Sequence, residues 1–306
     1  MKKQVAELIQ IKSVGQYHHL LHLPKPQHPL MSIMRFEDFP AIKIPHEIRF
    51  TLDFYTITIK ENCTCKSKYG QTMFDFDDGV MSFFAPKQVS GVEPDFYPPT
   101  GGWLLIFHPD LLRNYLLGQK IKDYAFFDYS VAEALILSEK EEESIYDIFA
   151  NISKEYNLPI DNFSQDVIIS QLDLLLTYSN RYYHRQFITR KTPNSDLLTK
   201  AEAILNECFA GNKIEIEGLP TVTLLAEKLH LSPKYLSEML RIYTGKTAQQ
   251  HIHERLIEKA KEKLSTTNLS VSEIAYELGF GYPQSFSKLF KTKTHLSPLE
   301  FRQSFN

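Results

Sequence analysis

The chain contains little cysteine and no long apolar run. Only three of its 306 residues are cysteine, and this odd number argues against a disulfide framework and fits a reducing compartment. No run of 18 apolar residues occurs, so no transmembrane helix is expected. The first residues, Met1-Lys2-Lys3-Gln4, soon reach Glu7 and lack the apolar stretch and cleavage site of a signal peptide. We therefore expect a cytoplasmic protein without a membrane partner.

The sequence is also poor in the patterns that form catalytic and metal sites. Segment 30–108 contains two histidines, His46 and His108, and no His-x-His pair that would gather a metal with a carboxylate. Histidines at positions 18, 19, 22 and 28 precede it without a matching cysteine, and we expect them to be solvated or capping residues. Cys63 and Cys65 are separated by one residue, and we expect two ordinary thiols rather than a metal site or a redox switch. We expect no catalytic residue, no metal and no cofactor.

Charge is divided unevenly along the chain. Residues 221–306 hold 12 Lys and Arg against 8 Glu, a net charge of +4, whereas residues 1–220 hold 22 basic against 29 acidic residues, a net of −7. A basic segment beside an acidic one fits neutralisation of DNA phosphates by part of the chain. The pI near 6.4 excludes a histone-like protein that coats DNA without regard to sequence. Reading of base edges is the better expectation.

The most informative pattern is an internal repeat within the last 86 residues. Its first copy comprises Leu225–Leu229, Ser232-Pro233 and Leu236–Arg241, and its second comprises Ile274–Leu278, Tyr282-Pro283 and Phe286–Lys291. Matching residues are 49 positions apart before the turn and 50 after it, so the second turn holds one additional residue. Each copy has the plan of a helix-turn-helix motif. Two such motifs in one chain predict reading of two stretches of one duplex without a dimer.

Each copy meets the physical requirements of that motif. Ala226 and Ala275 supply the small residue where the two helices cross. The turn needs a residue that tolerates positive φ, which Gly279 meets and His230 matches less well. Ser232 is an N-cap followed by proline at the first helical position. The second helices carry apolar stripes that are expected to pack inward, formed by Leu236, Met239 and Leu240 and by Phe286, Leu289 and Phe290.

A stretch free of proline and glycine, Thr247 to Leu264, joins the two copies and has apolar residues at helical spacing. As a helix these residues span roughly 27 Å. With the packing of the flanking helices added, the two second helices would lie about 34 Å apart, which is one turn of B-DNA. The spacing therefore predicts that one chain reads two adjacent major grooves.

Residues 222–302 resemble the DNA-binding domain of the AraC/XylS family of bacterial transcription regulators. The second-motif signature of that family reads here as Ile274-Ala275, Gly279-Phe280, Phe286, Lys288, Phe290-Lys291, Ser297-Pro298 and Arg302. Lys288 stands where the family usually has Arg, His295 where it has Gly, and Phe301 where it has Tyr. Because Lys lacks the planar fork of Arg, phosphate contact is more expected for Lys288 than base reading. His295 must adopt a left-handed conformation.

The resemblance implies DNA contacts at outward positions of both second helices. The candidates are Lys234, Ser237, Glu238 and Arg241 in the first, and Gln284, Ser285, Ser287, Lys288 and Lys291 in the second. Gln pairs with adenine, Glu accepts from cytosine, and Arg or Lys favours guanine. Arg241 and Lys291 lie late in their helices and are expected to contact phosphates. The alternative for each position is a solvated surface residue.

Residues 30–108 are expected to form short strands, because aromatic and β-branched runs alternate with Pro, Gly or Asp. The runs are Leu30–Phe36, Phe50–Lys60, Gln71–Phe76, Val80–Ala85 and Trp103–Phe107. They predict a small antiparallel barrel or sandwich, and the resemblance implies a cupin-like barrel that binds a small effector of unknown identity. Phe54, Tyr69 and Trp103 are candidate ligand contacts, with a hydrophobic core as the alternative.

Helices are predicted at Pro109–Leu117, Glu139–Tyr156 and Asn162–Phe187. One face of the last carries Ile168, Leu172, Leu175 and Tyr178. A helix at this place pairs subunits in relatives, so we expect this face to form a homodimer. The alternative is that it packs on its own barrel.

The expected fold class is α+β. An N-terminal cupin-like antiparallel β-barrel with flanking helices precedes an all-α domain, in which a linker helix joins two helix-turn-helix motifs. Residues 1–190 form the effector-sensing and dimerisation domain, with the barrel at about 30–108 and helices at about 109–190. Residues 191–195 are a polar linker, and 196–306 are the DNA-binding domain, opened by a helix from Asp196 to Phe209.

The sequence favours a one-component transcription regulator that responds to an effector and binds double-stranded DNA. The resemblance implies an activator that contacts RNA polymerase. One alternative is an enzyme that uses the same DNA module, which would need a nucleophilic cysteine or a metal cluster in the first domain. Another is an interaction protein whose helices no longer read DNA. That protein would carry apolar or acidic residues at the outward positions, and only Glu238 fits this description.

Overall fold

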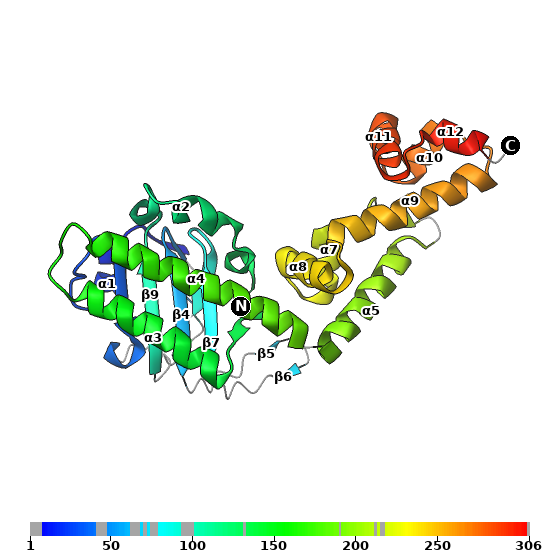
Figure 1. Cartoon of the computed structure of the whole chain (residues 1–306). Helices are drawn as coiled ribbons and strands as arrows, with labels where there is room; N and C mark the ends of the chain where they lie inside the picture. The colour runs from blue at the N-terminus through cyan, green and yellow to red at the C-terminus, as the bar shows by residue number, and fades with distance from the viewer. Residues whose placement is uncertain are drawn as a thin grey trace, which may run out of the picture. The chain divides into compact units, whose positions relative to one another are not determined.

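The chain divides into two compact units, Met1–Gln186 and Phe187–Asn306 (Figure 1). This computed structural model describes residues 8–40, 48–61, 68–69, 72–73, 79–92, 101–130, 133–189, 191–210, 213–214 and 218–304. Among these residues no helix is both long enough and apolar enough to cross a bilayer.

The first unit is built on a five-stranded sheet in the order β10-β7-β4-β9-β2. Its strands are Leu135–Ile136, Val80–Phe84, Tyr55–Glu61, Gly101–Phe107 and Met31–Arg35 in that order, and every neighbouring pair is antiparallel. All seven residues of β9 are buried. This explains why the strand is a continuous apolar run rather than an alternating one, since both of its faces are covered.

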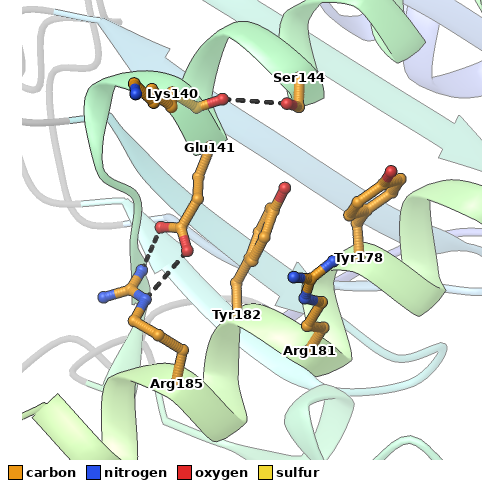
Figure 2. Close-up of a pocket in the computed structure, with 7 residues that line it drawn as sticks. All are labelled: Lys140, Glu141, Ser144, Tyr178, Arg181, Tyr182 and Arg185. Carbon is orange, nitrogen blue, oxygen red and sulfur yellow. Dashed lines mark hydrogen bonds and ion pairs between the residues drawn. The ribbon is translucent and has the colours of Figure 1, made fainter.

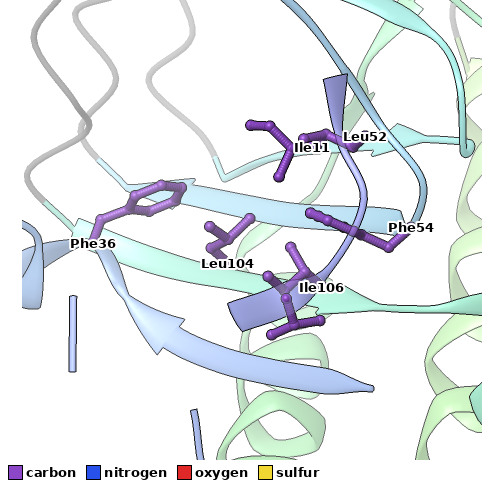
Figure 3. Packing of buried hydrophobic residues seen from close by; sticks show 7 residues of the cluster. Ile11, Phe36, Leu52, Phe54, Leu104 and Ile106 are labelled. Carbon is purple, nitrogen blue, oxygen red and sulfur yellow. The ribbon is translucent and has the colours of Figure 1, made fainter. Parts of the chain in front are cut away.

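A second sheet packs against one face of the first. It consists of β1 (Leu8–Ile11), β3 (Ile48–Leu52) and β8 (Val89–Val92), with β1 and β3 parallel and β3 and β8 antiparallel. Figure 3 shows the apolar cluster between the sheets, which contains Ile11, Phe36, Leu52, Phe54, Leu104 and Ile106. A two-stranded pair, β5 (Lys68–Tyr69) and β6 (Thr72–Met73), stands apart from both sheets.

Two long helices, α3 (Glu139–Tyr156) and α4 (Ser164–Thr189), cross the other face of the five-stranded sheet (Figure 1). Trp103 of β9 stacks on Phe149 of α3, with ring centroids 6.2 Å apart. Because Trp103 and Leu104 are neighbours in a strand, their side chains point to opposite faces of the sheet. The helices therefore form a third layer over the side that Trp103 occupies.

The closed barrel expected from the sequence differs from these open sheets. In the described part of the chain the strands form separate sheets, and one pairing, between β1 and β3, is parallel. The expected strand Phe50–Lys60 is divided into β3 and β4. The expected helix Pro109–Leu117 is instead a 3-10 helix, η2 (Pro109–Leu112), followed by the short α2 (Leu117–Lys120).

The second unit is all-helical in its described part. Its helices are α5 (Lys191–Cys208), α7 (Val222–Leu229), α8 (Pro233–Thr244), α9 (Ala248–Thr266), α10 (Val271–Glu277), α11 (Pro283–Thr294) and α12 (Pro298–Gln303). The linker expected at 191–195 is helical in its backbone and begins α5. Pro193 is compatible with this place because first-turn positions have no intrahelical partner for their N–H groups.

The repeat is longer than two helices. Thr247 begins α9 with a capping box completed by Gln250, and Ser297 begins α12 with one completed by Glu300. Each copy is therefore a unit of three helices, α7–α8 with the start of α9, and α10–α11 with α12. Arg302 Nε donates to the Leu264 carbonyl at 3.2 Å, which fastens α12 to the end of α9.

Candidate nucleic-acid interface

The first motif, α7 and α8, contains the sharp turn that a helix-turn-helix requires. Ala226 is completely buried where the helices cross. His230 ends α7 in the left-handed region with φ 56°, and the Leu231 N–H closes the turn onto the Ala226 carbonyl at 2.9 Å. His230, the weaker match to the turn by its sequence, therefore adopts the positive φ that the turn requires.

The second motif, α10 and α11, makes the same turn with glycine. Gly279 has φ 78°, and the Phe280 N–H bonds to the carbonyl of the buried Ala275 at 2.9 Å. The two residue types exchange places at the far end of the second helix. There the left-handed residue is Gly245 after α8 and His295, with φ 64°, after α11. The left-handed conformation predicted for His295 is confirmed.

Apolar stripes hold α8 and α11 by their inner faces. Leu236, Met239 and Leu240 are at most 1% exposed on α8, as predicted. On α11 Phe286 and Phe290 are completely buried, whereas Leu289, which was expected in the same stripe, is half-buried. Ser232 caps α8 by accepting from the Tyr235 N–H at 3.2 Å, whereas Tyr282 caps α11 without a side-chain hydrogen bond. The outer faces are therefore fixed in direction and available to a partner.

On α8 the four candidate contact residues differ in accessibility. Lys234 and Arg241 are exposed and Ser237 is half-buried. Glu238 has a side chain only 18% exposed, and its carboxylate forms an ion pair with Arg241 at 2.5 Å. An acceptor held in this way must leave Arg241 before it can accept a hydrogen bond from a cytosine. The positive charge of Arg241 is partly neutralised by the same contact.

On α11 the candidates form a uniformly polar and basic face. Gln284, Ser285, Lys288 and Lys291 are exposed, and Ser287 is half-buried. The helix from Pro283 to Thr294 contains three lysines and no Asp or Glu. The third, Lys293, is also exposed. Because it follows Lys291 by two positions, its side chain lies on the other side of the helix from Lys291.

The candidate ligand contacts of the first unit do not converge. Phe54 is completely buried in the cluster between the sheets, while Trp103 is 8% exposed on the face covered by α3. Tyr69 belongs to β5, but its side chain lies outside the described residues, as do Cys63 and Cys65. Cys208 is buried, as expected.

The helix face expected to pair two chains is occupied within the first unit. Ile168, Leu172 and Leu175 are at most 5% exposed, and Tyr178 is half-buried. A side chain that already contacts its own core offers almost no apolar surface to a partner. The burial of these residues favours the alternative for this face, in which it packs on its own unit.

The histidines near the start of the first unit also have structural roles. His18 is buried, with its Nδ1 2.6 Å from the Pro24 carbonyl and its Nε2 2.9 Å from Ser32 Oγ. His28 accepts from the Leu30 N–H at 3.1 Å, and burial lowers its pKa.

Comparison with known proteins finds a family match within the second unit. Residues 225–304 match the model of a helix-turn-helix domain family. A segment of 116 residues is 31% identical to the HTH-type transcriptional activator RhaS of Salmonella paratyphi B, covering 38% of this chain and 42% of that protein. Another of 154 residues is 25% identical to histidine kinase P4 of Formosa agariphila, covering 50% of this chain and 10% of the kinase. The matches thus span less than half of these curated relatives.

A solved structure is also similar to part of the chain. A transcriptional regulator from Chromobacterium violaceum, described by its AraC-type DNA-binding domain, is 20% identical with a TM-score of 0.32. The match covers 37% of this chain and 95% of the Chromobacterium violaceum chain.

Proposed function

We propose, from the premise that residues 225–304 are an AraC-type helix-turn-helix domain, that this chain regulates transcription by binding specific sites on double-stranded DNA. The observation that carries the proposal is the outer face of α11. It exposes Gln284, Lys288 and Lys291 on a helix that holds no carboxylate and whose opposite face is fixed by Phe286 and Phe290. Such a face can bind phosphates through lysine and read a base edge through glutamine.

Two motifs in one chain support reading of two successive major grooves. The connecting helix α9 has 19 residues, which corresponds to about 28 Å of helix length. Adjacent major grooves on one side of B-DNA are about 34 Å apart. With the widths of the flanking helices added, this length suits one motif in each groove.

The first unit takes the sensing role in this proposal, and it binds a small molecule whose presence alters DNA binding. By the same resemblance, RNA polymerase is the protein partner and activation is the mode of regulation. The proposed function locates the chain with the bacterial chromosome in the cytoplasm. An interaction protein built on the same helices is the alternative, but it would have no need for three exposed lysines without a nearby carboxylate on α11.

The experiment is a selection of bound duplexes from a random pool by the full-length protein at two salt concentrations. The proposal expects an enriched sequence with two blocks spaced near one helical turn, and enrichment that survives the higher salt. The variant Gln284→Ala/Lys288→Ala should lose one block, whereas Lys154→Gln, an exposed change on α3, should keep both. Failure of the wild-type protein to enrich any sequence would contradict the proposal.

A further inference from the structure

The first unit has a second feature that the DNA-binding proposal does not use. A cleft of about 360 Å³ opens between α3 and α4, and its lining is dominated by charged and hydroxyl-bearing side chains (Figure 2). All of its lining residues lie between 140 and 185. Its volume falls in the lower part of the range of small-molecule sites.

One side of the cleft is a closed ion pair. Arg185 Nε donates to Glu141 Oε1 at 3.0 Å, its Nη2 bonds to the other carboxylate oxygen, and the same nitrogen donates to the Ile136 carbonyl at 2.8 Å. The Glu141 carboxylate also accepts from the Ser138 N–H at 2.9 Å. The Glu141 charge is therefore satisfied by groups of the protein, and this pair fixes α3 against α4.

Two further cations line the cleft on opposite helices, Lys140 on α3 and Arg181 on α4. Figure 2 shows the Glu141 side chain and the Tyr182 ring between them. Both are exposed. Within the described residues, no carboxylate lies within salt-bridge distance of either side chain. Since Glu141 and Arg185 compensate each other, the lining carries an excess of two positive charges, which favours an anionic occupant.

Aromatic side chains complete the cleft. The ring centroids of Tyr178 and Tyr182 lie 5.6 Å apart, and the rings are tilted by 37°. Figure 2 shows Tyr182 between the Glu141–Arg185 pair and Tyr178. Tyr182 is 6% exposed, and burial raises the pKa of its phenol, so the hydroxyl keeps its proton and can donate. The half-buried ring of Tyr178 offers an apolar surface beside Arg181.

The chemistry of these groups selects one class of ligand. The guanidinium of Arg binds two oxygens of a carboxylate or phosphate at once, and Lys adds a point charge from the other side. We propose that the α3–α4 cleft binds a small organic oxyanion. Its phosphate or carboxylate group binds Arg181, its organic part packs against the neighbouring ring of Tyr178, and Lys140 adds a positive charge at the other end of the cleft.

The site gives a location and a chemical class to the small molecule of the proposed function, and it rests on that function only for the regulatory role. Binding itself is measured on the full-length protein without DNA. A failure here is therefore distinguishable from a failure of the DNA-binding proposal.

The experiment is a calorimetric titration with phenyl phosphate, benzoate and inorganic phosphate. We expect one site per chain for phenyl phosphate or benzoate, bound more tightly than inorganic phosphate. Because a charge-assisted hydrogen bond is lost, Arg181→Gln should weaken this binding about tenfold. Lys140→Gln removes only a longer-range attraction and should weaken it less. The control Lys154→Gln, exposed in the last turn of the same helix, should bind as the wild type does.

Unchanged circular dichroism and unfolding temperature establish that the variants are folded, as expected for exposed positions. The absence of binding by the wild type at millimolar concentrations of every probe would overturn the inference. So would equal binding by the wild type and the Arg181→Gln/Lys140→Gln double variant. If inorganic phosphate bound as tightly as phenyl phosphate, the assignment of an organic part to the ligand would be wrong.

Discussion

The two helix-turn-helix motifs share a fold and differ in the surface they offer. Position by position, Glu238 of α8 corresponds to Lys288 of α11, and Arg241 corresponds to Lys291. The first helix carries two basic residues and one acid, and the second carries three lysines and no acid. The Glu238–Arg241 ion pair further reduces the positive electrostatic potential at the outer face of α8. The second motif is therefore the stronger electrostatic partner for DNA.

The two motifs also differ in how they pack against the rest of their unit, and here the first motif makes more contacts at the matching position. Tyr235 of α8 is buried against Phe187, with ring centroids 4.9 Å apart, and the Tyr243 hydroxyl donates to the Phe187 carbonyl. The position that matches Tyr235 in α11 is Ser285, which is exposed. The first motif is thus fastened to upstream residues of its unit, whereas the second leaves the same place open to a partner. We infer that the first motif contributes more to the fold and the second more to affinity.

The largest expected effect concerns the core of the second motif. Phe286 is completely buried and contacts Phe280 and Phe290, with ring centroids 5.5 Å and 5.8 Å apart. Phe286→Ala should therefore lower the free energy of unfolding by about 3–5 kcal/mol and abolish specific DNA binding. Urea denaturation followed by circular dichroism measures the change. Leu299→Ala, at a side chain 56% exposed, is the control and should stay within about 0.5 kcal/mol. A loss below about 1 kcal/mol for Phe286→Ala would show that this cluster does not hold the motif together.

Exchange of charge between matching positions is the next test. Lys288→Glu should weaken DNA binding about 100-fold at low salt, because an attraction to phosphate becomes a repulsion. Glu238→Lys should strengthen nonspecific binding about tenfold by removing the acid that pairs with Arg241. Fluorescence anisotropy on one duplex measures both, with Lys154→Glu as a control of equal charge change outside the motifs. If Lys288→Glu weakened DNA binding by the same factor by which Glu238→Lys strengthened it, the two motifs would contribute equally, which would contradict this account.

Base reading is expected to depend on Gln284. The variant Gln284→Ala should lose about 1–3 kcal/mol of discrimination at one base pair while the unfolding free energy stays unchanged, since the side chain is exposed. The ratio of affinities for the selected duplex and a single-base variant gives the result. If wild type and variant bind every sequence equally, Gln284 does not contribute to base recognition.

Salt dependence distinguishes the two late-helix cations. Lys291→Gln should reduce the slope of log affinity against log salt by about 1, because one phosphate contact is lost. Arg241→Gln should reduce it by less, because Arg241 already pairs with Glu238. The same anisotropy titration, repeated over a range of salt, measures both slopes. A larger change for Arg241→Gln would reverse the ranking of the motifs.

The smallest effect is a pH dependence to which His251, beside the first motif, contributes. His251 Nε2 lies 2.8 Å from Thr244 Oγ1 and occupies the position of Phe301 in the second copy. Burial lowers its pKa from the ordinary value of 6.5. The unfolded chain therefore takes up a proton first as the pH falls, so stability is complete above pH 6.5 and declines below it. His253, whose pKa burial also lowers, acts in the same direction.

Thermal unfolding between pH 8 and pH 5 checks this dependence. His251→Phe, which copies the second motif, should weaken the decline and leave the contribution of His253. An unchanged pH profile in this variant would remove His251 from the account.

The local features of the helical unit could be predicted from the sequence because short-range chemistry determines them. The left-handed turns at His230 and His295 follow from their position where related motifs use glycine, and the buried stripes follow from helical spacing. The pairing of Glu238 with Arg241 is one turn apart in α8 and was within reach of the same reasoning. The anchoring of Tyr235 was not, since it depends on Phe187, far upstream in the chain.

The first unit was less predictable because its pairings are long-range. The strand β1 is only four residues long and pairs with β3 about forty residues later, a register that no local pattern indicates. The apolar face of α4 was identified correctly, but an apolar stripe looks the same whether a second chain or the chain's own sheet covers it. The ion pair between Glu141 and Arg185, which shapes the α3–α4 cleft, likewise joins two helices and leaves no sequence motif.

On this account, two motifs of one chain bind adjacent major grooves, and the second motif binds more strongly. The most direct test is a map of base contacts along a selected duplex, obtained by removing single bases and measuring the binding that remains. The account predicts two blocks of sensitive bases about one helical turn apart. Gln284→Ala should erase sensitivity at one base of the more sensitive block and leave the other block unchanged. A single block, or two blocks that respond equally to Gln284→Ala, would contradict it.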